Sequence, residues 1–236
     1  MRLHCHKKGL MMDGHIHKLF DRELHDLKEN LLLMGGLVEQ AIMNAIKALE
    51  ERNSQLAAQV ISDDDKVDAN EIEIDEFCLK LLALRQPAAR DLRFITTAIK
   101  INYDLERIGD MAVNLCERVQ ELNTEPQLKP YITLPQMARI VQMMLKDCLD
   151  AFVNENVELA LKVTKDDEQV DELLGQISHE LFAHMMKDYS SVSRATRLMF
   201  IAKYLERIAD HAVNIAELVI FMVNGKNIRH QKHYAE

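Results

Sequence analysis

The sequence predicts an all-α protein made of two tandem three-helix bundles, and three observations support this fold class. Helix-breaking residues are scarce, since Gly occurs 7 times and Pro 4 times among 236 residues. Strong helix formers such as Leu, Ala, Glu and Lys dominate, whereas aromatic residues make up only 5% of the chain. Apolar residues recur at helical spacing, and the pattern of the first half returns in the second. This composition excludes turn-rich sandwiches and barrels.

Three helices are expected in the first half. Apolar spacings of three and four residues run over 20–49, and Ser54 is a candidate N-cap for the helix that follows. The second helix is expected over 55–85, because the residue before Pro87 avoids the helical region. The third is expected over 88–122. Long helices joined by such short turns predict an antiparallel bundle.

The second half repeats this plan after a linker. The stretch 123–135 holds three of the four prolines and lies at mid-chain. Two helices are expected over 133–154 and 157–188. A last helix follows a turn at 189–193 and ends at Gly225, a candidate C-cap. The two halves therefore contain the same number of helices in the same order.

An internal duplication defines the expected units. Adding 103 to a residue number relates the first two helices of the two halves, and adding 100 relates 105–114 to 205–214. The first bundle is expected over 20–122 and the second over 134–225, with a linker at 123–133 between them. A flexible N-terminal extension is expected at 1–19 and a loose tail at 226–236.

Charge and cysteine usage narrow the function classes. A formal net charge of −9 argues against a nucleic-acid partner, because phosphate neutralisation drives that binding, and leaves cations or basic surfaces as partners. The four cysteines are far apart and predict reduced core thiols of a cytosolic protein. No unbroken apolar run approaches the ~18 residues of a membrane span, and the N-terminus lacks the apolar region of a secretory signal. We expect a cytoplasmic location.

Paired carboxylates are the strongest chemical signal. Each pair has the spacing i, i+4, which places both groups on one helix face. The pairs occupy matching repeat positions, with Asp64, Asp68, Glu106 and Asp110 in the first half and Asp167, Asp171, Glu206 and Asp210 in the second. In an antiparallel hairpin, two pairs can face each other and gather four carboxylates. Like charges at this spacing cost a few tenths of a kcal/mol, which a bound multivalent cation would reverse.

All-oxygen ligands favour a divalent or trivalent hard cation, with Mg, Mn and Fe as candidates and Zn also possible. The acidic line is longer in the first half, where it adds Glu71 and Asp75, whose repeat positions are Leu174 and Ser178. The first site should therefore hold more cation than the second. The alternative is a solvated acidic face without metal.

Enzymatic signatures are missing from the sequence. Ferritin-like di-iron centres use Glu-x-x-His, which does not occur, and the phosphate-loop, dinucleotide and nucleophile-elbow motifs are also absent. We expect His211 to be a surface histidine. The cluster His4-Cys5-His6, with His15 and His17, could chelate a soft metal, although a disordered tail is favoured. No enzyme is expected, with metal storage or oxidation as the alternative.

The doubled acidic motif has a known counterpart. The segments Leu105-Glu-Arg-Ile-Gly-Asp110 and Leu205-Glu-Arg-Ile-Ala-Asp210 closely resemble the Glu/Asp-x-x-x-Asp signature of the PhoU family, bacterial regulators of phosphate uptake. Met34-Gly-Gly, Arg85-Gln-Pro87 and Asp91-Leu-Arg93 also fit that family. The resemblance covers about 20–225, nearly the whole chain.

This resemblance implies a function and a set of partners. It implies a cytoplasmic, often dimeric six-helix protein that restrains the phosphate-starvation response. The implied partners are the phosphate-sensing histidine kinase and the ATPase subunit of the phosphate importer, with membrane association only through them. Some members hold metal on the doubled motif, which assigns the eight carboxylates named above to two metal sites. The family gives no role to the histidine-bearing extension.

Overall fold

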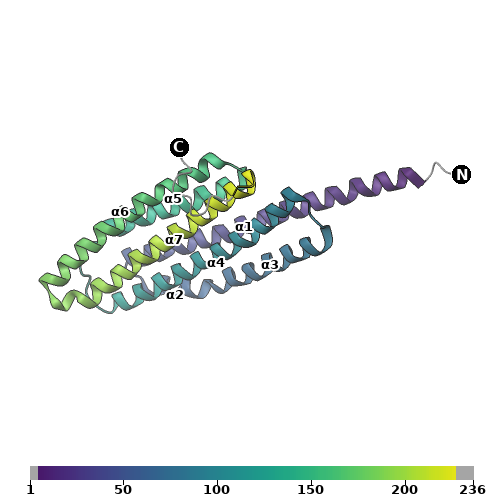
Figure 1. Cartoon of the computed structure of the whole chain (residues 1–236). Helices are drawn as coiled ribbons and strands as arrows, with labels where there is room; N and C mark the ends of the chain where they lie inside the picture. Colours follow the sequence, from purple (N-terminus) through teal and green to yellow (C-terminus); the bar gives the residue numbers. More distant parts are fainter. Residues whose placement is uncertain (1–4, 227–236) are drawn as a thin grey trace.

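In the computed structural model, the backbone is described for residues 5–226 and the side chains for residues 18–226. This part of the chain is helical and contains no strand, which confirms the predicted fold class. Figure 1 shows long helices running along a common axis, with the N-terminal part of α1 extending beyond the bundle. The elements are α1 (Cys5–Glu50), α2 (Ser54–Asp63), α3 (Asp65–Arg85), α4 (Ala89–Asn123), α5 (Thr133–Asn154), α6 (Val157–Lys187), the 3-10 turn η1 (Tyr189–Ser191) and α7 (Val192–Asn224).

The two halves pack through equivalent helices. Within the first half, α1, α2 and α3 pack on α4, and within the second, α5 and α6 pack on α7. Between the halves, α4 packs on α7 and α1 packs on α5 (Figure 1). Both of these pairs join helices at the same position of the repeat, as a pseudo-twofold arrangement requires.

The core is built from long apolar stripes on each helix. In α1, Leu27, Leu31, Met34, Val38 and Ile42 are fully buried at spacings of three and four residues. By length and composition, 18–50 of this helix could cross a membrane, which differs from the sequence expectation, and it alone meets that criterion among the described helices. The buried stripe accounts for its apolar content, because it faces the bundle core.

The second predicted helix is divided in two. It was expected over 55–85, but α2 ends at Asp63 and α3 begins at Asp65. Three consecutive aspartates, which are poor helix formers that repel one another, meet at the break. The Asp64 carbonyl then accepts hydrogen bonds from the amides of Val67 and Asp68, at 2.8 and 3.0 Å. The break therefore places Asp64 at the entry of a new helix.

Several helix ends differ in detail from those expected. The N-cap of α2 is Asn53 rather than Ser54, and its side chain accepts hydrogen bonds from two backbone amides of the first turn. Helix α1 begins at Cys5 rather than near Phe20, because apolar periodicity marks a buried face and not the full helix length. The C-cap at Gly225 is confirmed, with φ of 68°. The flexibility of 1–19 stays a prediction, and the tail from 227 onward lies outside the described residues.

The linker is held in place by arginines. Arg52, in the turn between α1 and α2, donates hydrogen bonds to the carbonyl oxygens of Leu122 and Asn123, at 3.2 and 3.1 Å. From the start of α7, Arg197 forms ion pairs with Glu121 and Glu125, at 2.7 and 3.1 Å. These contacts tie the exit of α4 to both halves of the molecule.

Candidate carboxylate site

Four carboxylates of the first half gather where α3 packs on α4. Asp64 and Asp68 lie at the start of α3, and Glu106 and Asp110 lie on α4. Burial, as the largest cause, and then the charges of Asp68, Asp110 and Glu106 together raise the pKa of Asp64 to about 6. The four groups are therefore close enough to repel one another, as the sequence predicted.

A glycine lets α4 approach this cluster. A Cβ atom at Gly109 would lie 3.1 Å from Oδ1 of Asp64 and 3.3 Å from Cγ1 of Val67. Both distances are tighter than ordinary van der Waals contact. The equivalent residue in the second half is Ala209, which is fully buried. The first cluster is thus built around a closer approach of its two helices than an alanine would readily allow.

The second half contains the matching cluster where α6 packs on α7. Asp167 and Asp171 lie on α6, and Glu206 and Asp210 lie on α7. Burial, as the largest cause, and then the charges of Asp210, Asp171 and Glu206 together raise the pKa of Asp167 to about 6. Unlike Asp64, Asp167 lies within one continuous helix. The carboxylates of the two clusters therefore repel one another in the same way, although the helix is broken at Asp64 and continuous at Asp167.

One buried oxygen in each cluster lacks a hydrogen-bond partner. The atoms are Oε2 of Glu106 and Oε2 of Glu206, whose side chains are 19% and 14% exposed. A wholly solvated acidic face would leave both side chains in water. Asp68, Asp171 and Asp210 are exposed and form the outer rim. Each cluster thus has a partly buried side and a solvent side.

Neighbouring cations partly neutralise the clusters. Arg107 reaches Asp110 with an Nη1–Oδ2 hydrogen bond of 2.8 Å, and its Nε lies 3.1 Å from Oε2 of Glu106 without hydrogen-bond geometry. Lys203 lies 2.6 Å from Oε1 of Glu206. The counterion therefore differs between the halves, since Glu106 lies beside Arg107 and the equivalent Glu206 lies beside Lys203.

The clusters fit a hard cation in donor chemistry but are not ready-made metal sites. Carboxylate oxygens, an unpartnered buried oxygen and raised pKa values are what a cation site in protein would offer. Among the described side chains, however, no three His, Cys, Asp or Glu are arranged to hold one metal ion. Coordination would therefore need side-chain rotation.

The additional acidic residues of the first half lie along the same helix. Burial is the largest cause that raises the pKa of Glu106, and the charges of Asp110, Asp68 and Glu71 raise it as well. Asp75 is one turn further on, where its charge adds to the burial that raises the pKa of Cys78 to about 12. Of these two added residues, Glu71 acts on the first cluster through Glu106, whereas Asp75 acts on Cys78.

The expectation that His211 is a surface residue was wrong. Its side chain is 18% exposed, and its Nδ1 lies 2.8 Å from Oδ1 of Asp104, which is itself nearly buried. The pair joins α7 to α4 across the interface between the halves. The equivalent positions in the repeat are Met111 and Tyr204, so the pair breaks the internal symmetry. An aspartate at a position occupied by tyrosine in the other repeat was the available signal.

The cysteines whose side chains are described lie in the core, as predicted. Cys78, Cys116 and Cys148 are buried free thiols, and burial raises their pKa values, to about 12 for Cys78 and Cys116. The side chains of the predicted soft-metal cluster, His4-Cys5-His6 with His15 and His17, lie outside the described part.

Fold and site together define a class of protein: a duplicated helical bundle with one acidic cluster in each repeat. The sequence model of the PhoU domain matches two segments, 31–119 and 134–219, one in each half. The chain therefore belongs to the PhoU family.

Individual relatives support this membership over most of the chain. A Pseudomonas aeruginosa protein described as a phosphate-specific transport system accessory protein PhoU homolog is 42% identical over 92% of this chain and 90% of its own. An Aquifex aeolicus homolog of the same description is 43% identical over 91% and 96%.

Two solved structures have the same fold. The crystal structure of PhoU from P. aeruginosa has a TM-score of 0.85 at 42% identity and covers 88% of this chain and 100% of that one. The phosphate transport system regulatory protein PhoU from Streptococcus pneumoniae has a TM-score of 0.83 at 33% identity, over 88% and 98%.

Proposed function

We propose that this chain is a non-enzymatic accessory regulator of phosphate uptake that restrains the phosphate-starvation response. The observation that carries this proposal is the match of both repeats to the PhoU domain, together with relatives whose descriptions name them as phosphate transport accessory proteins. Function would then reside in binding surfaces.

The proposed partners are two proteins of the phosphate system. One is the ATPase subunit of the high-affinity importer, and the other is the phosphate-sensing histidine kinase. The chain would act in the cytoplasm as an adaptor between them, as a homodimer, and would reach the membrane only through these complexes. Binding to nucleic acid is not part of this proposal, because the net charge of −9 opposes it.

Bound cation is proposed as a stabiliser of the adaptor. Asp64, Asp68, Glu106 and Asp110 would hold one ion or cluster, and Asp167, Asp171, Glu206 and Asp210 another. The cation would supply positive charge that relieves the repulsion between the buried carboxylates. Metal storage or oxidation is the alternative function, supported by the buried Oε2 atoms of Glu106 and Glu206, which accept no hydrogen bond.

A gene deletion tests the regulatory proposal. Removing the chain should leave phosphate-starvation genes expressed at high phosphate, and the intact chain should restore repression. Expression that stays phosphate-responsive in the deletion strain would contradict the proposal. Oxygen consumption by the purified protein with Fe²⁺ tests the alternative, because an adaptor has no turnover.

A further inference from the structure

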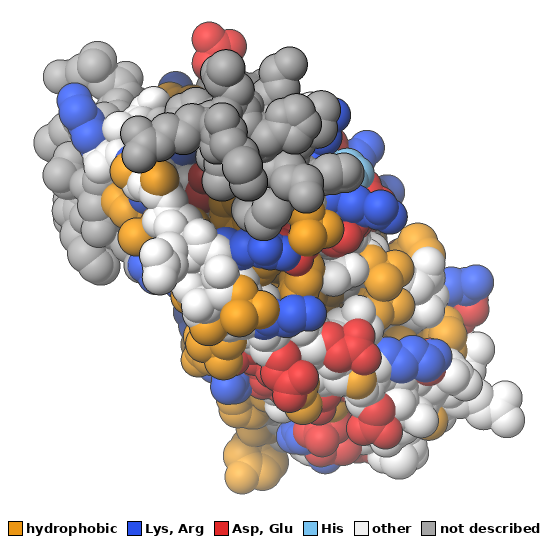
Figure 2. Space-filling view, turned by 90° about the vertical axis from the view of Figure 1, so that its right-hand side faces the viewer, with side chains coloured by type: hydrophobic (Ala, Val, Ile, Leu, Met, Phe, Trp, Pro, Cys, Tyr) orange, Lys and Arg blue, Asp and Glu red, His pale blue; other side chains and the backbone are white. Residues whose placement is uncertain are grey.

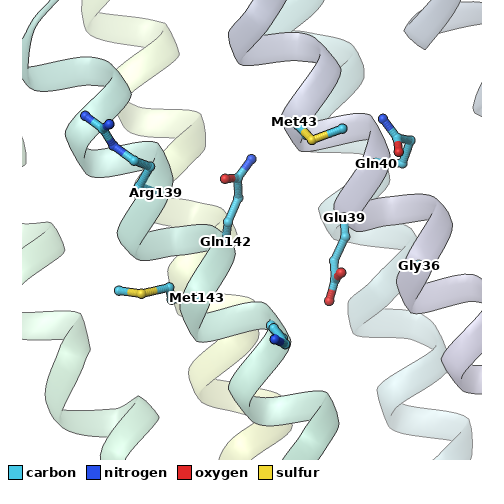
Figure 3. Close-up of a pocket in the computed structure, with 8 residues that line it drawn as sticks. Gly36, Glu39, Gln40, Met43, Arg139, Gln142 and Met143 are labelled. Carbon is cyan, nitrogen blue, oxygen red and sulfur yellow. The ribbon is translucent and has the colours of Figure 1, made fainter.

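A groove runs along the surface between α1 and α5. Its deeper part is a cavity of about 480 Å³, and Figure 3 shows the side chains of the two helices around it. A second hollow of about 320 Å³ continues the groove toward Glu50 and Pro135. The two helices are antiparallel, because Gly35 meets Leu149 near one end whereas Glu50 and Pro135 lie together at the other.

The charged residues that line the groove are divided between its two walls, the α1 wall and the α5 wall. The α1 wall, which ends one residue past the helix, carries three carboxylates and one lysine. The α5 wall carries one arginine and one lysine, and none of its lining residues is acidic. The formal charges of the walls are therefore −2 and +2. The residues are Glu39, Lys47, Glu50 and Glu51 on the α1 wall and Arg139 and Lys146 on the α5 wall.

This separation of charge is not a general property of the surface. On the end of the molecule shown in Figure 2, acidic and basic side chains stand side by side with hydrophobic ones scattered among them. In the groove, all six charged residues except Glu39 are exposed, and none of them forms an ion pair with another described residue. Two walls of opposite charge are thus left without ion-pair partners.

Residues of the two walls lie level with each other in three pairs. Two of the pairs each line one hollow together. The third pair is coupled electrostatically, because burial raises the pKa of Glu39 and the charge of Lys146 opposes that rise. The pairs are Met43 with Met143, Glu50 with Arg139, and Glu39 with Lys146.

Two copies of this chain can face each other through the groove in two symmetric ways. When the twofold axis runs across the helices, α1 of one copy lies on α1 of the other, so that acidic wall meets acidic wall and basic wall meets basic wall. When the axis runs along the groove, α1 of each copy lies on α5 of the other. Only the second arrangement brings walls of opposite charge together, and contacts between like charges oppose association.

The second arrangement also keeps every residue at its level along the groove. A rotation about an axis parallel to the helices carries a side chain over the opposite wall without moving it along the groove. The three level pairs are therefore the pairs that meet between the copies, and each of them forms twice. Two antiparallel helix pairs stacked in this way make a four-helix bundle.

The apolar side chains suit this contact. Met43 and Met143 are 49% and 53% exposed, and each would meet the other methionine of the second copy. Methionine is flexible and fills irregular gaps, so these four side chains can occupy the hollows between the layers. We propose that the groove is the interface of a twofold dimer of this chain, in which α1 of each copy lies on α5 of the other.

The size of the groove sets the expected strength of the dimer. From Gly36 to Glu51 at 1.5 Å per residue it is about 22 Å long, and two helices are about 20 Å wide. The dimer would bury roughly 1,000 Å² in total, which is at the low end for specific interfaces. We expect a dissociation constant on the order of micromolar, which rises with salt because the contact is charged.

This inference rests on the homodimer in the proposed function and gives it a surface. The test is sedimentation equilibrium of the full chain over a series of concentrations. Arg139→Glu with Lys146→Glu makes both walls acidic and should weaken self-association at least tenfold. Lys100→Glu with Lys187→Glu is the control of equal charge change on other exposed helix faces and should stay within twofold. Thermal melting checks that the variants are folded.

A second variant makes the test reciprocal. Glu50→Lys with Glu51→Lys makes both walls basic and should also weaken self-association at least tenfold. When this variant is mixed with the acidic-wall variant, each wall meets one of opposite charge again. The mixture should therefore form a heterodimer at least as tightly as the unmodified chain forms its homodimer, which general repulsion between acidic proteins would not produce.

Cross-linking tests the alignment of the helices. In a Cys5→Ser background the remaining cysteines are buried, so an introduced thiol reports its own surroundings. With diamide as oxidant, a mixture of Met43→Cys and Met143→Cys copies should form a disulfide-linked dimer, and each variant alone should not. A linked dimer from Met43→Cys alone would place α1 on α1 and contradict the proposed arrangement.

The remaining outcomes separate this interface from the regulatory proposal. An unmodified chain that stays monomeric across the concentration series would show that the proposed dimer is wrong. A dimer that both charge variants form as tightly as the unmodified chain would show that another surface is used. Neither result bears on regulation, because the gene deletion measures phosphate-responsive expression whatever the oligomeric state.

Discussion

The two acidic clusters carry equivalent carboxylates in unequal surroundings. Around the first, the helix breaks at Asp64, Gly109 allows a close approach and Arg107 is the counterion. Around the second, α6 is continuous, Ala209 replaces the glycine and Lys203 is the counterion. The helix geometry, the close approach and the counterion thus differ, while the carboxylates are the same in both repeats. The predictions below test whether the clusters also behave as equivalents.

The largest expected effect comes from filling the close approach in the first cluster. Gly109→Leu would overpack the contact with Asp64 and Val67 and should destabilise the protein by about 3 kcal/mol. For a chain of this size that lowers the melting temperature by roughly 6–12 °C. Calorimetry should show almost no loss for Gly175→Leu, which has open space. Equal melting points for both variants would show that the close approach is not required.

Added cation should stabilise the protein by a similar amount. At 100 times its dissociation constant, an ion that binds only the folded chain contributes about 2.7 kcal/mol, or roughly 5–10 °C. Glu106→Gln with Asp110→Asn should remove the response of the first cluster, and Glu206→Gln with Asp210→Asn that of the second. Melting curves with chelator and with Mg²⁺, Mn²⁺ or Fe³⁺ measure this. A parent curve that moves with none of these ions would end the metal proposal.

The asymmetric pair between the halves should matter less. His211→Leu leaves the nearly buried carboxylate of Asp104 without its partner, which costs about 1–3 kcal/mol. At the equivalent site, Met111→Leu replaces one apolar side chain by another of similar volume and should cost under about 1.5 kcal/mol. Chemical denaturation of the two variants compares them. A smaller loss for His211→Leu than for Met111→Leu would contradict a stabilising role for the pair.

The smallest expected effect is a pH dependence. The folded pKa values of Asp64 and Asp167 are about 6, above the 3.8 of the unfolded chain, so these groups bind protons more tightly when folded. The metal-free protein should therefore gain stability from them as pH falls from about 7 to 4. After allowance for solvent screening, we expect about 1 kcal/mol per group.

Single amide variants isolate this contribution. Asp64→Asn and Asp167→Asn should each be more stable than the parent at pH 7, and the difference should vanish near pH 4. Denaturation at a series of pH values gives the two differences directly. Unequal differences would show that the clusters are electrostatically distinct, and a difference that grows toward pH 4 would contradict the assigned direction.

Much of this architecture followed from periodicity, and the exceptions have physical causes. Helices α4 to α7 end close to their expected limits because proline, glycine and the polar turns act locally along the chain. The break at Asp64 was not expected, because the apolar stripe continues through it with Val60 and Val67 both buried. The start of α1 was missed for the opposite reason, since its N-terminal part has no apolar stripe.

The clustering of the carboxylates was predictable from the sequence, whereas the contacts between the halves were not. The spacing of the carboxylates placed Asp64 with Glu106 and Asp167 with Glu206, and the electrostatic effects on the two aspartates agree. The pair of His211 with Asp104 joins residues 107 apart, so no local pattern could reveal it, and only the comparison of Asp104 with Tyr204 in the other repeat marked the position. The groove likewise depends on how α1 meets α5, which is a property of the assembled halves.

The packing of α4 on α7 and of α1 on α5 has a consequence for how the fold depends on concentration. An interface between equivalent helices has the form of a twofold dimer interface written within one chain. A chain with a single repeat could cover these apolar stripes only by pairing with a second molecule. Its stability would therefore fall as the protein is diluted. The linker, held by Arg52 and Arg197, supplies the second repeat at a fixed effective concentration, so the interface forms equally well when the protein is scarce.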